Sequence, residues 1–236
     1  YVVGILLAQY LMMKLDDRAP VPMLSKAARD SLVMYGVLGI ILGGRVGYIL
    51  FYNFSYFLEN PHHMFAVWEG GMSFHGGLIG VTLAFLLFAR RFGIRFLSMM
   101  DLIAVVAPLG LFFGRLANFV NGELYGRVTE SPLGMVFPRG GPLPRHPSQL
   151  YEAALEGVVL FTVMWLVANR TRVREKPGFL AGLFITGYGI ARFSVEFVRE
   201  PDVQLGLLTF GLSMGQLLCL PMLALGVFLM VRAKRY

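Results

Sequence analysis

Three arginines and one histidine of this sequence fall inside long apolar segments, where ionisable side chains are rare. Arg45, Arg115 and Arg192 lie within the second, fourth and sixth of seven such segments, and His75 lies near the start of the third. Charges at these positions are costly and usually face a protein interior or a water-filled cavity. We therefore expect the four side chains to line a polar site.

The residues next to two of these arginines support a shared polar face. Arg192 and Glu196 are four residues apart, and Arg115 and Asn118 are three apart, so each pair falls on one face of a helix. Guanidinium groups bind phosphate through paired N–H donors. The pattern predicts a cluster of positive charges that binds an anionic lipid headgroup.

Each of these residues also has a structural interpretation. Arg45 could pair with a backbone carbonyl or an acid, while Arg115 and Arg192 could extend their charged ends to the membrane interface. Asp101 stands at the start of a predicted helix, where the helix dipole favours an acid, so we interpret it as structural.

The apolar segments are the elements that must position the site. Six of the seven approach the ~20 residues that a helix needs to cross about 30 Å of hydrocarbon, and they are too long for barrel strands. The chain is 56% hydrophobic and only 15% charged. We predict an all-α integral membrane protein with seven transmembrane helices, forming a single transmembrane catalytic domain over residues 1–236. The segments are 1–13, 31–52, 71–89, 101–121, 149–169, 178–198 and 209–231.

The basic residues indicate how the chain is oriented. Most of the 21 lysines and arginines follow the odd-numbered segments. The positive-inside rule places those loops in the cytoplasm, which assigns the net charge of +7 to membrane orientation rather than to nucleic-acid binding. The three arginines then lie ~21 Å from the inner ends of their helices, near the outer leaflet. The opposite loops, 53–69 and 122–148, are long enough to form a small extracytoplasmic cap.

The single cysteine and three pairs of glycines give further expectations. The only cysteine, Cys219, lies in an apolar segment and is interpreted as a small buried side chain, so no disulfide and no metal site are predicted. We expect no cofactor. Glycines four residues apart predict close helix contacts at three places. These pairs are Gly43 with Gly47, Gly76 with Gly80, and Gly110 with Gly114.

Five blocks of sequence combine into a specific pattern. They are GGRVGY at 43–48, WEGGMSFHGG at 68–77, GRLANFVNGELYGR at 114–127, RHPSQLYE at 145–152, and GYGIAR at 187–192 followed by Glu196, Arg199, Pro201 and Asp202. Together, and in this order, they resemble the bacterial prolipoprotein diacylglyceryl transferase family over nearly the whole chain.

The resemblance implies an activity and a site. It implies transfer of the diacylglyceryl group of phosphatidylglycerol to the lipobox cysteine of a prolipoprotein signal peptide, with release of glycerol phosphate. It also implies a multi-pass location in the bacterial cytoplasmic membrane, with the site toward the outer leaflet. Arg115 and Arg192 would hold the phosphate, and we add Arg45 to the substrate-binding residues. The other implied site residues are His75, Asn118, Glu123, Gly126 and Glu196.

One departure from the family concerns a tyrosine. The family carries it in a Tyr-Gly pair near the outer end of the first helix, whereas Tyr1 is followed by valine. We expect the chain to begin partway through that helix.

The implied reaction has two chemical demands. A thiol with an ordinary pKa of about 8.5 must be deprotonated, and the leaving phosphate must be stabilised. We predict that His75 is the general base, with lipid binding as its alternative role, and that Arg115 and Arg192 neutralise the leaving group. A transporter for an anionic solute and a lipid-binding scaffold without chemistry are the competing interpretations.

Overall fold

The computed structural model of the chain describes residues 2–19, 21–170, 172–200 and 211–233. Its helices fall into two compact units, one made of Tyr1–Leu15 with Met100–Tyr236 and the other of Asp16–Met99. Within the described ranges, every regular element is a helix, and the remaining backbone pairs are isolated bridges. The prediction of an all-α chain is therefore confirmed. The positions Tyr1, Pro201 and Asp202, which the sequence patterns include, lie outside the described residues.

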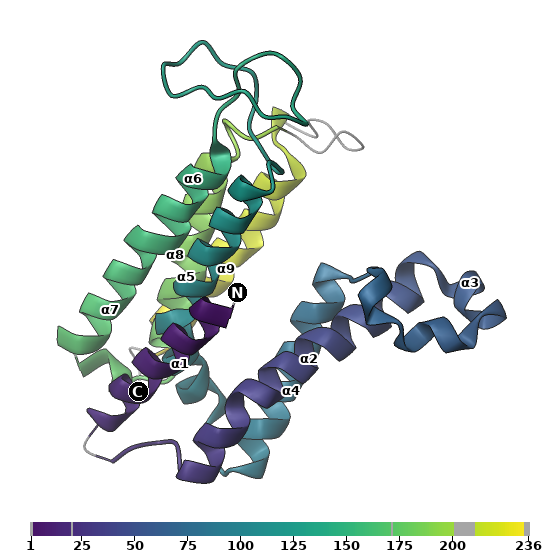
Figure 1. Cartoon of the computed structure of the whole chain (residues 1–236). Helices are drawn as coiled ribbons and strands as arrows, with labels where there is room; N and C mark the ends of the chain where they lie inside the picture. The colour runs from purple at the N-terminus through teal and green to yellow at the C-terminus, as the bar shows by residue number, and fades with distance from the viewer. Residues whose placement is uncertain (1, 20, 171, 201–210, 234–236) are drawn as a thin grey trace. The chain divides into compact units, whose positions relative to one another are not determined.

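The smaller unit is built on two long helices, α2 (Lys26–Tyr52) and α4 (Phe74–Arg91), which lie side by side (Figure 1). Glycine allows their backbones to touch. A Cβ atom added to Gly43 would meet the carbonyl of Gly76, and one added to Gly80 would meet the carbonyl of Gly39. The close contact predicted from these glycines is confirmed.

Three short helices connect α2 to α4. They are α3 (Phe54–Glu59), η1 (Pro61–Phe65) and η2 (Val67–Glu69). The chain then returns to α2, because the backbone N–H of Ser73 donates to the carbonyl of Gly44 at 2.9 Å. The hydroxyl of Ser73 accepts from the N–H of Gly76 at 3.1 Å and caps the start of α4.

The larger unit contains four long helical stretches, which lie side by side in Figure 1, together with α1 (Val2–Asp17) as far as Leu15. They are α5 (Phe96–Val120), the continuous helix that carries α6 (Ser148–Glu152), η3 (Ala153–Val159) and α7 (Leu160–Arg170), then α8 (Phe179–Val195) and α9 (Met214–Ala233), with the short turn η4 (Arg172–Glu175) before α8. The segment η3 is a π-helix. Such segments are rare and often occur at functional sites.

Asp101 joins two of these helices. It lies inside α5, which begins earlier than predicted, at Phe96. Its carboxylate accepts hydrogen bonds from the N–H groups of Gly178 and Ala181, both at 2.7 Å. Asp101 therefore caps the start of α8 rather than that of its own helix, which agrees with its structural interpretation.

Five helices in the described part of the chain are long and apolar enough to cross a membrane. They are Lys26–Tyr52, Phe74–Arg91, Phe96–Val120, Ser148–Asn169 and Met214–Ala233. Helix α8 is apolar but shorter, with 17 residues. Within the described residues, each of the seven predicted apolar segments overlaps a helix, and the number of seven crossings stays a prediction. Gly110 was wrongly expected at a close contact, because a Cβ atom there would meet no described atom within 4 Å.

The loop between α5 and α6 is folded rather than extended. Arg145 pairs with both Val128 and Met135 through isolated antiparallel bridges. Its side chain donates to the carbonyls of Gly140 and Gly126 and forms an ion pair with Glu200 at 2.8 Å. One arginine therefore holds together three stretches of backbone.

Candidate functional site

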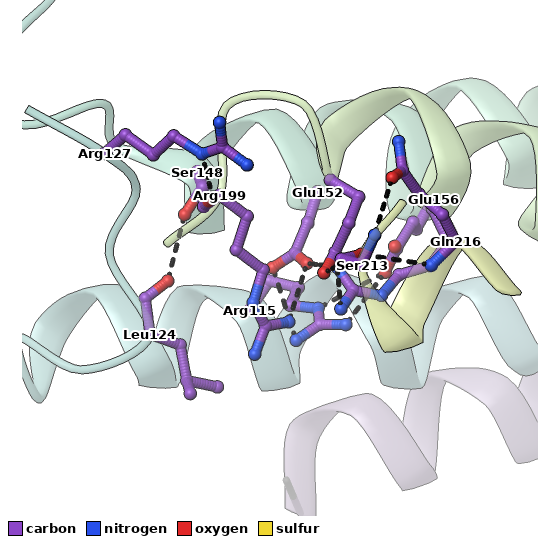
Figure 2. A network of polar contacts seen from close by, with 11 residues as sticks. Arg115, Leu124, Arg127, Ser148, Glu152, Glu156, Arg199, Ser213 and Gln216 are labelled. Carbon is purple, nitrogen blue, oxygen red and sulfur yellow. Dashed lines mark hydrogen bonds and ion pairs between the residues drawn. The ribbon is translucent and has the colours of Figure 1, made fainter. Parts of the chain in front are cut away.

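The larger unit contains a cluster of arginines and glutamates that is contributed by separate helices. Arg115 comes from α5, Glu152 from α6, Glu156 from η3 and Arg192 from α8, and Arg199 follows α8. Figure 2 shows Arg115 and Arg199 extending toward Glu152. Residues that lie far apart in the sequence thus meet between the helices of one bundle.

Glu152 lies at the centre of this cluster. Its Oε1 atom lies 2.8 Å from Arg192 Nη1 and 3.5 Å from Arg199 Nη1. Its Oε2 atom lies 3.3 Å from Arg115 Nη1. The glutamate has no exposed surface. A single buried carboxylate is therefore shared by three guanidinium groups, which fixes their mutual positions.

Glu156 lies one helical turn further along and is also fully buried. Its Oε2 atom accepts hydrogen bonds from Nε and Nη2 of Arg115, at 3.3 and 3.2 Å. Arg115 thus contacts two carboxylates. Its Nη1 atom faces Glu152, and its Nε and Nη2 atoms face Glu156. Because both carboxylates come from one helical face, they hold α5 against the α6–η3 stretch.

On the other side of the cluster, Glu196 pairs with Arg192. The Oε2 atom of Glu196 lies 2.7 Å from Arg192 Nη2, so the prediction that these residues share a helical face is confirmed. The Oε1 atom accepts a hydrogen bond from the hydroxyl of Ser213 at 2.8 Å. A Cβ atom at Gly215 would meet the Glu196 carboxylate, so glycine leaves room for it.

The electrostatics differ from the sequence expectation. We expected a cluster of positive charges, but each of the three arginines is paired with buried glutamate. The side chains of Arg115, Arg192 and Arg199 retain only 14–15% exposure. They are therefore desolvated donors held in place by carboxylates. Such preorganised donors suit the stabilisation of an anion whose charge grows during a reaction.

Asn118 and Glu123 form a second contact at the end of α5. The Asn118 amide donates to Glu123 Oε1 at 2.9 Å, and the Asn121 amide donates to the same atom at 3.3 Å. These two hydrogen bonds stabilise the ionised form and lower the pKa of Glu123. The Gln149 amide donates to the backbone carbonyl of Glu123 at 2.6 Å. The predicted residues Asn118 and Glu123 thus lie together, beside the helix that carries Glu152.

Gly126 is a packing position. Its N–H donates to the carbonyl of His146 at 2.8 Å, and its backbone pairs with Arg199 in an isolated bridge. A Cβ atom there would meet the carbonyl of Val198 and the side chain of His146. Any other residue would push this loop away from Arg199, which explains why glycine stands here.

Arg45 belongs to the smaller unit and is buried, with 6% exposure. Its guanidinium donates to the backbone carbonyls of His63, Met64, Gly70 and Gly71. These are the contacts expected from its structural interpretation, and a role in substrate binding stays a prediction. Arg45 thus holds together the backbone turns that connect η1 to α4.

His75 is the second residue of α4 and is exposed. Its ring lies edge-on to that of Phe74, with 5.6 Å between the ring centroids. Among the described residues, none forms a hydrogen bond with the imidazole. Its ring nitrogens are therefore not committed to other side chains of the smaller unit. The convergence of His75 with Arg115 and Arg192 stays a prediction.

Sequence reasoning overlooked part of this cluster. Glu152 and Tyr188 were quoted only as members of sequence blocks, and Glu156 and Ser213 were not considered. Tyr188 lies within electrostatic range of Arg115, Arg192 and both buried glutamates. The signal was present, because two acids four residues apart in an apolar segment are as unusual as the arginines that we singled out.

In the described part of the chain, no three metal-binding side chains come together.

Comparisons with known proteins show the family of this chain. The sequence profile of the family described as prolipoprotein diacylglyceryl transferase matches residues 1–232. A protein of Nitratidesulfovibrio vulgaris named phosphatidylglycerol–prolipoprotein diacylglyceryl transferase is 58% identical over 202 residues, which cover 85% of this chain and 76% of that protein. Proteins of the same name from Brucella anthropi and Rhodospirillum rubrum are 54% and 52% identical over the whole chain, and 86% of each is covered. The chain therefore belongs to the prolipoprotein diacylglyceryl transferase family.

Proposed function

We propose that this chain transfers the diacylglyceryl group of phosphatidylglycerol to a cysteine thiol of a prolipoprotein, a step of bacterial lipoprotein maturation. Family membership supports the reaction. The observation that carries the mechanism is that Arg115 and Arg192, from separate helices, share the buried carboxylate of Glu152. Two guanidinium groups fixed at one place form a clamp for a phosphodiester.

The clamp acts on the leaving group. The thiolate attacks C3 of the glyceryl group, the new S–C bond forms as the C–O bond to phosphate breaks, and the bonding electrons leave with glycerol phosphate. Arg115 and Arg192 stabilise the charge that gathers on the phosphate oxygens. Because the guanidinium groups are already held by Glu152 and Glu196, little reorganisation is needed at the moment of reaction.

The thiol must first lose its proton. In this proposal His75 accepts it, since a neutral imidazole is a base near neutral pH. The proton then passes to solvent after the product leaves. In this proposal residues 1–236 act as one catalytic domain.

The membrane arrangement follows from the same proposal. Seven helices cross the bacterial cytoplasmic membrane, with the basic loops in the cytoplasm and the site facing the outer leaflet. The folded loop between α5 and α6 then forms the extracytoplasmic cap. Phosphatidylglycerol enters from the surrounding membrane lipid, and the lipobox cysteine of the prolipoprotein signal peptide approaches the same site.

The proposal is tested by assaying purified protein with phosphatidylglycerol and a lipobox peptide. Release of glycerol phosphate should fall by ~100-fold or more in Arg115→Ala and Arg192→Ala, because each removes a preorganised donor. Arg90→Ala, an exposed position at the end of α4, is the matched control and should retain the normal rate. Normal rates in both clamp variants would contradict the clamp.

The same assay separates the role of His75 and the competing functions. His75→Gln should lower the rate and remove the part of its pH dependence that reports the general base. An unchanged rate and pH profile would exclude His75 as the base. A transporter or a lipid-binding scaffold would release no glycerol phosphate from any variant or from the unchanged protein.

A further inference from the structure

The charges of the buried cluster balance. Arg115, Arg192 and Arg199 provide three positive charges, and Glu152, Glu156 and Glu196 provide three negative ones. The net charge is zero when every carboxylate is ionised. A phosphodiester carries one negative charge, so its entry would leave an uncompensated charge in a poorly solvated place. Binding an anion here therefore requires that one carboxylate be displaced or neutralised.

The three carboxylates are not held equally. Both oxygens of Glu152 meet guanidinium groups, and those of Glu196 meet Ser213 and Arg192. Among the residues that the structure describes, Glu156 meets Arg115 alone, through Oε2, and over distances above 3 Å. Its Oε1 atom is buried and has no hydrogen-bond partner among the described residues. Glu156 is thus the carboxylate that the cluster stabilises least.

The groups around Glu156 define where a compensating proton can go. Arg115 faces it from α5, Glu152 from the preceding turn, Tyr188 and Arg192 from α8, and Cys219 from α9. Glu152 is held by three arginines, and Arg192 already binds two other carboxylates. Within the described ranges, Oε2 of Glu152 and of Glu196 also lack a hydrogen bond, but each forms an ion pair with an arginine. Oε1 of Glu156 is the oxygen of the three carboxylates for which the described residues provide neither a hydrogen bond nor an ion pair.

We propose that Glu156 is a positioning residue that holds Arg115 while the site is empty and takes up one proton when the phosphodiester binds. The proton comes from solvent and neutralises the carboxylate. Nε and Nη2 of Arg115 are then free to donate to the phosphate oxygens, and the net charge of the cluster stays at zero. Release of the anion reverses the exchange. This inference rests on the proposed clamp by Arg115 and Arg192.

The experiment is calorimetric binding of dioctanoylphosphatidylglycerol to the detergent-solubilised full chain, without a thiol peptide. Titrations at one pH in two buffers with different ionisation enthalpies count the protons exchanged. We expect uptake of about one proton per lipid bound, and an affinity that falls by up to about tenfold per unit rise in pH. In Glu156→Gln, uptake should vanish and the affinity should become independent of pH. Glu130→Gln, which changes an exposed loop carboxylate, should behave like the unchanged protein.

The outcomes separate this inference from the proposed function. If the unchanged protein binds the lipid with the same enthalpy in both buffers, no proton is taken up and the role of Glu156 is excluded, while the clamp stands. If proton uptake persists in Glu156→Gln, another group takes the proton and the inference is also wrong. If the unchanged protein binds no phosphatidylglycerol, the clamp itself fails. Absence of proton uptake by the unchanged protein overturns the inference even if the variant does not fold.

Discussion

Arg192 Nη1 lies 2.8 Å from Glu152 Oε1, although forty residues separate the two in the sequence. This contact joins α8 to α6 in the interior of a helical bundle. Glu152 also reaches Arg115 and Arg199, so one carboxylate connects three segments of the chain. The geometry of the proposed phosphate clamp and the stability of the bundle therefore depend on the same residue.

Glu152→Gln should strongly destabilise the protein. The substitution leaves three guanidinium groups close together without their shared counter-ion, and removing one partner of a buried ion pair costs about 3–5 kcal/mol. Thermal unfolding in detergent should show a clearly lower midpoint. The exposed Glu130→Gln provides the control and should change the free energy of unfolding by less than about 0.5 kcal/mol. Equal midpoints for the two variants would contradict the central role of Glu152.

Arg45→Met should loosen the connection between α2 and α4. The carbonyls of His63, Met64, Gly70 and Gly71 lose their donors, and hydrogen bonds to a charged group contribute about 1.5–3 kcal/mol each. Hydrogen–deuterium exchange should become at least about tenfold faster in peptides that cover residues 63–73. Arg90→Met should leave exchange there unchanged. A direct role of Arg45 in lipid binding would instead lower lipid affinity while this segment kept its protection.

Replacement by alanine should change the stability of the protein differently at two glycines of α4. A Cβ atom at Gly80 would meet the backbone of α2, so Gly80→Ala should cost about 1–3 kcal/mol of stability. The nearest atom to a Cβ at Gly77 is the carbonyl oxygen of Ile40 at 3.6 Å, which is an ordinary contact. Gly77→Ala should therefore be neutral or stabilise the helix by up to about 1 kcal/mol. Urea or thermal unfolding of both variants checks this, and a similar loss in both would rule out the close helix contact.

Acidification should release the contact between Asn118 and Glu123. Hydrogen bonds from Asn118 and Asn121 lower the pKa of Glu123 below its ordinary value of 4.5. The stabilisation is thus fully present above pH 4.5 and is lost as the pH falls through the lowered pKa. In Asn118→Ala the pKa of Glu123 should rise toward 4.5. Carbon NMR of labelled glutamate in the two proteins measures this shift, whereas an unchanged titration would show that the contact is absent in solution.

Local sequence patterns were sufficient to predict the helices, one ion pair within a helix and one contact between two helices. Hydrophobic runs located the helical segments, and the spacing of Arg192 and Glu196 predicted an ion pair that spans one turn. Glycine spacing predicted the contact of α2 with α4, because small residues allow backbones to approach. Each of these features depends on residues within one helix or on a pattern that repeats along it.

Contacts between distant segments were beyond such reasoning. Asp101 caps a helix through the N–H of Gly178, which lies 77 residues later, and no spacing rule connects these positions. The pairing of Arg115 with Glu156 likewise depends on how α5 packs against η3. The prediction of excess positive charge was wrong because Glu152 and Glu156 were not counted with the arginines that they pair with. A search for acids in the same apolar segments would have indicated the neutral cluster.

The π-helical segment Ala153–Val159 has a consequence for how this helix can change during evolution. A π-helical turn contains one residue more than an α-helical path needs. Deleting one residue there would restore ordinary winding and keep Glu152 and the stretch after Leu160 in phase. The same deletion within Leu160–Arg170 would rotate everything beyond it by about 100°. The segment is thus a place where this membrane helix can lose a residue without rotating the stretches on either side of it relative to each other.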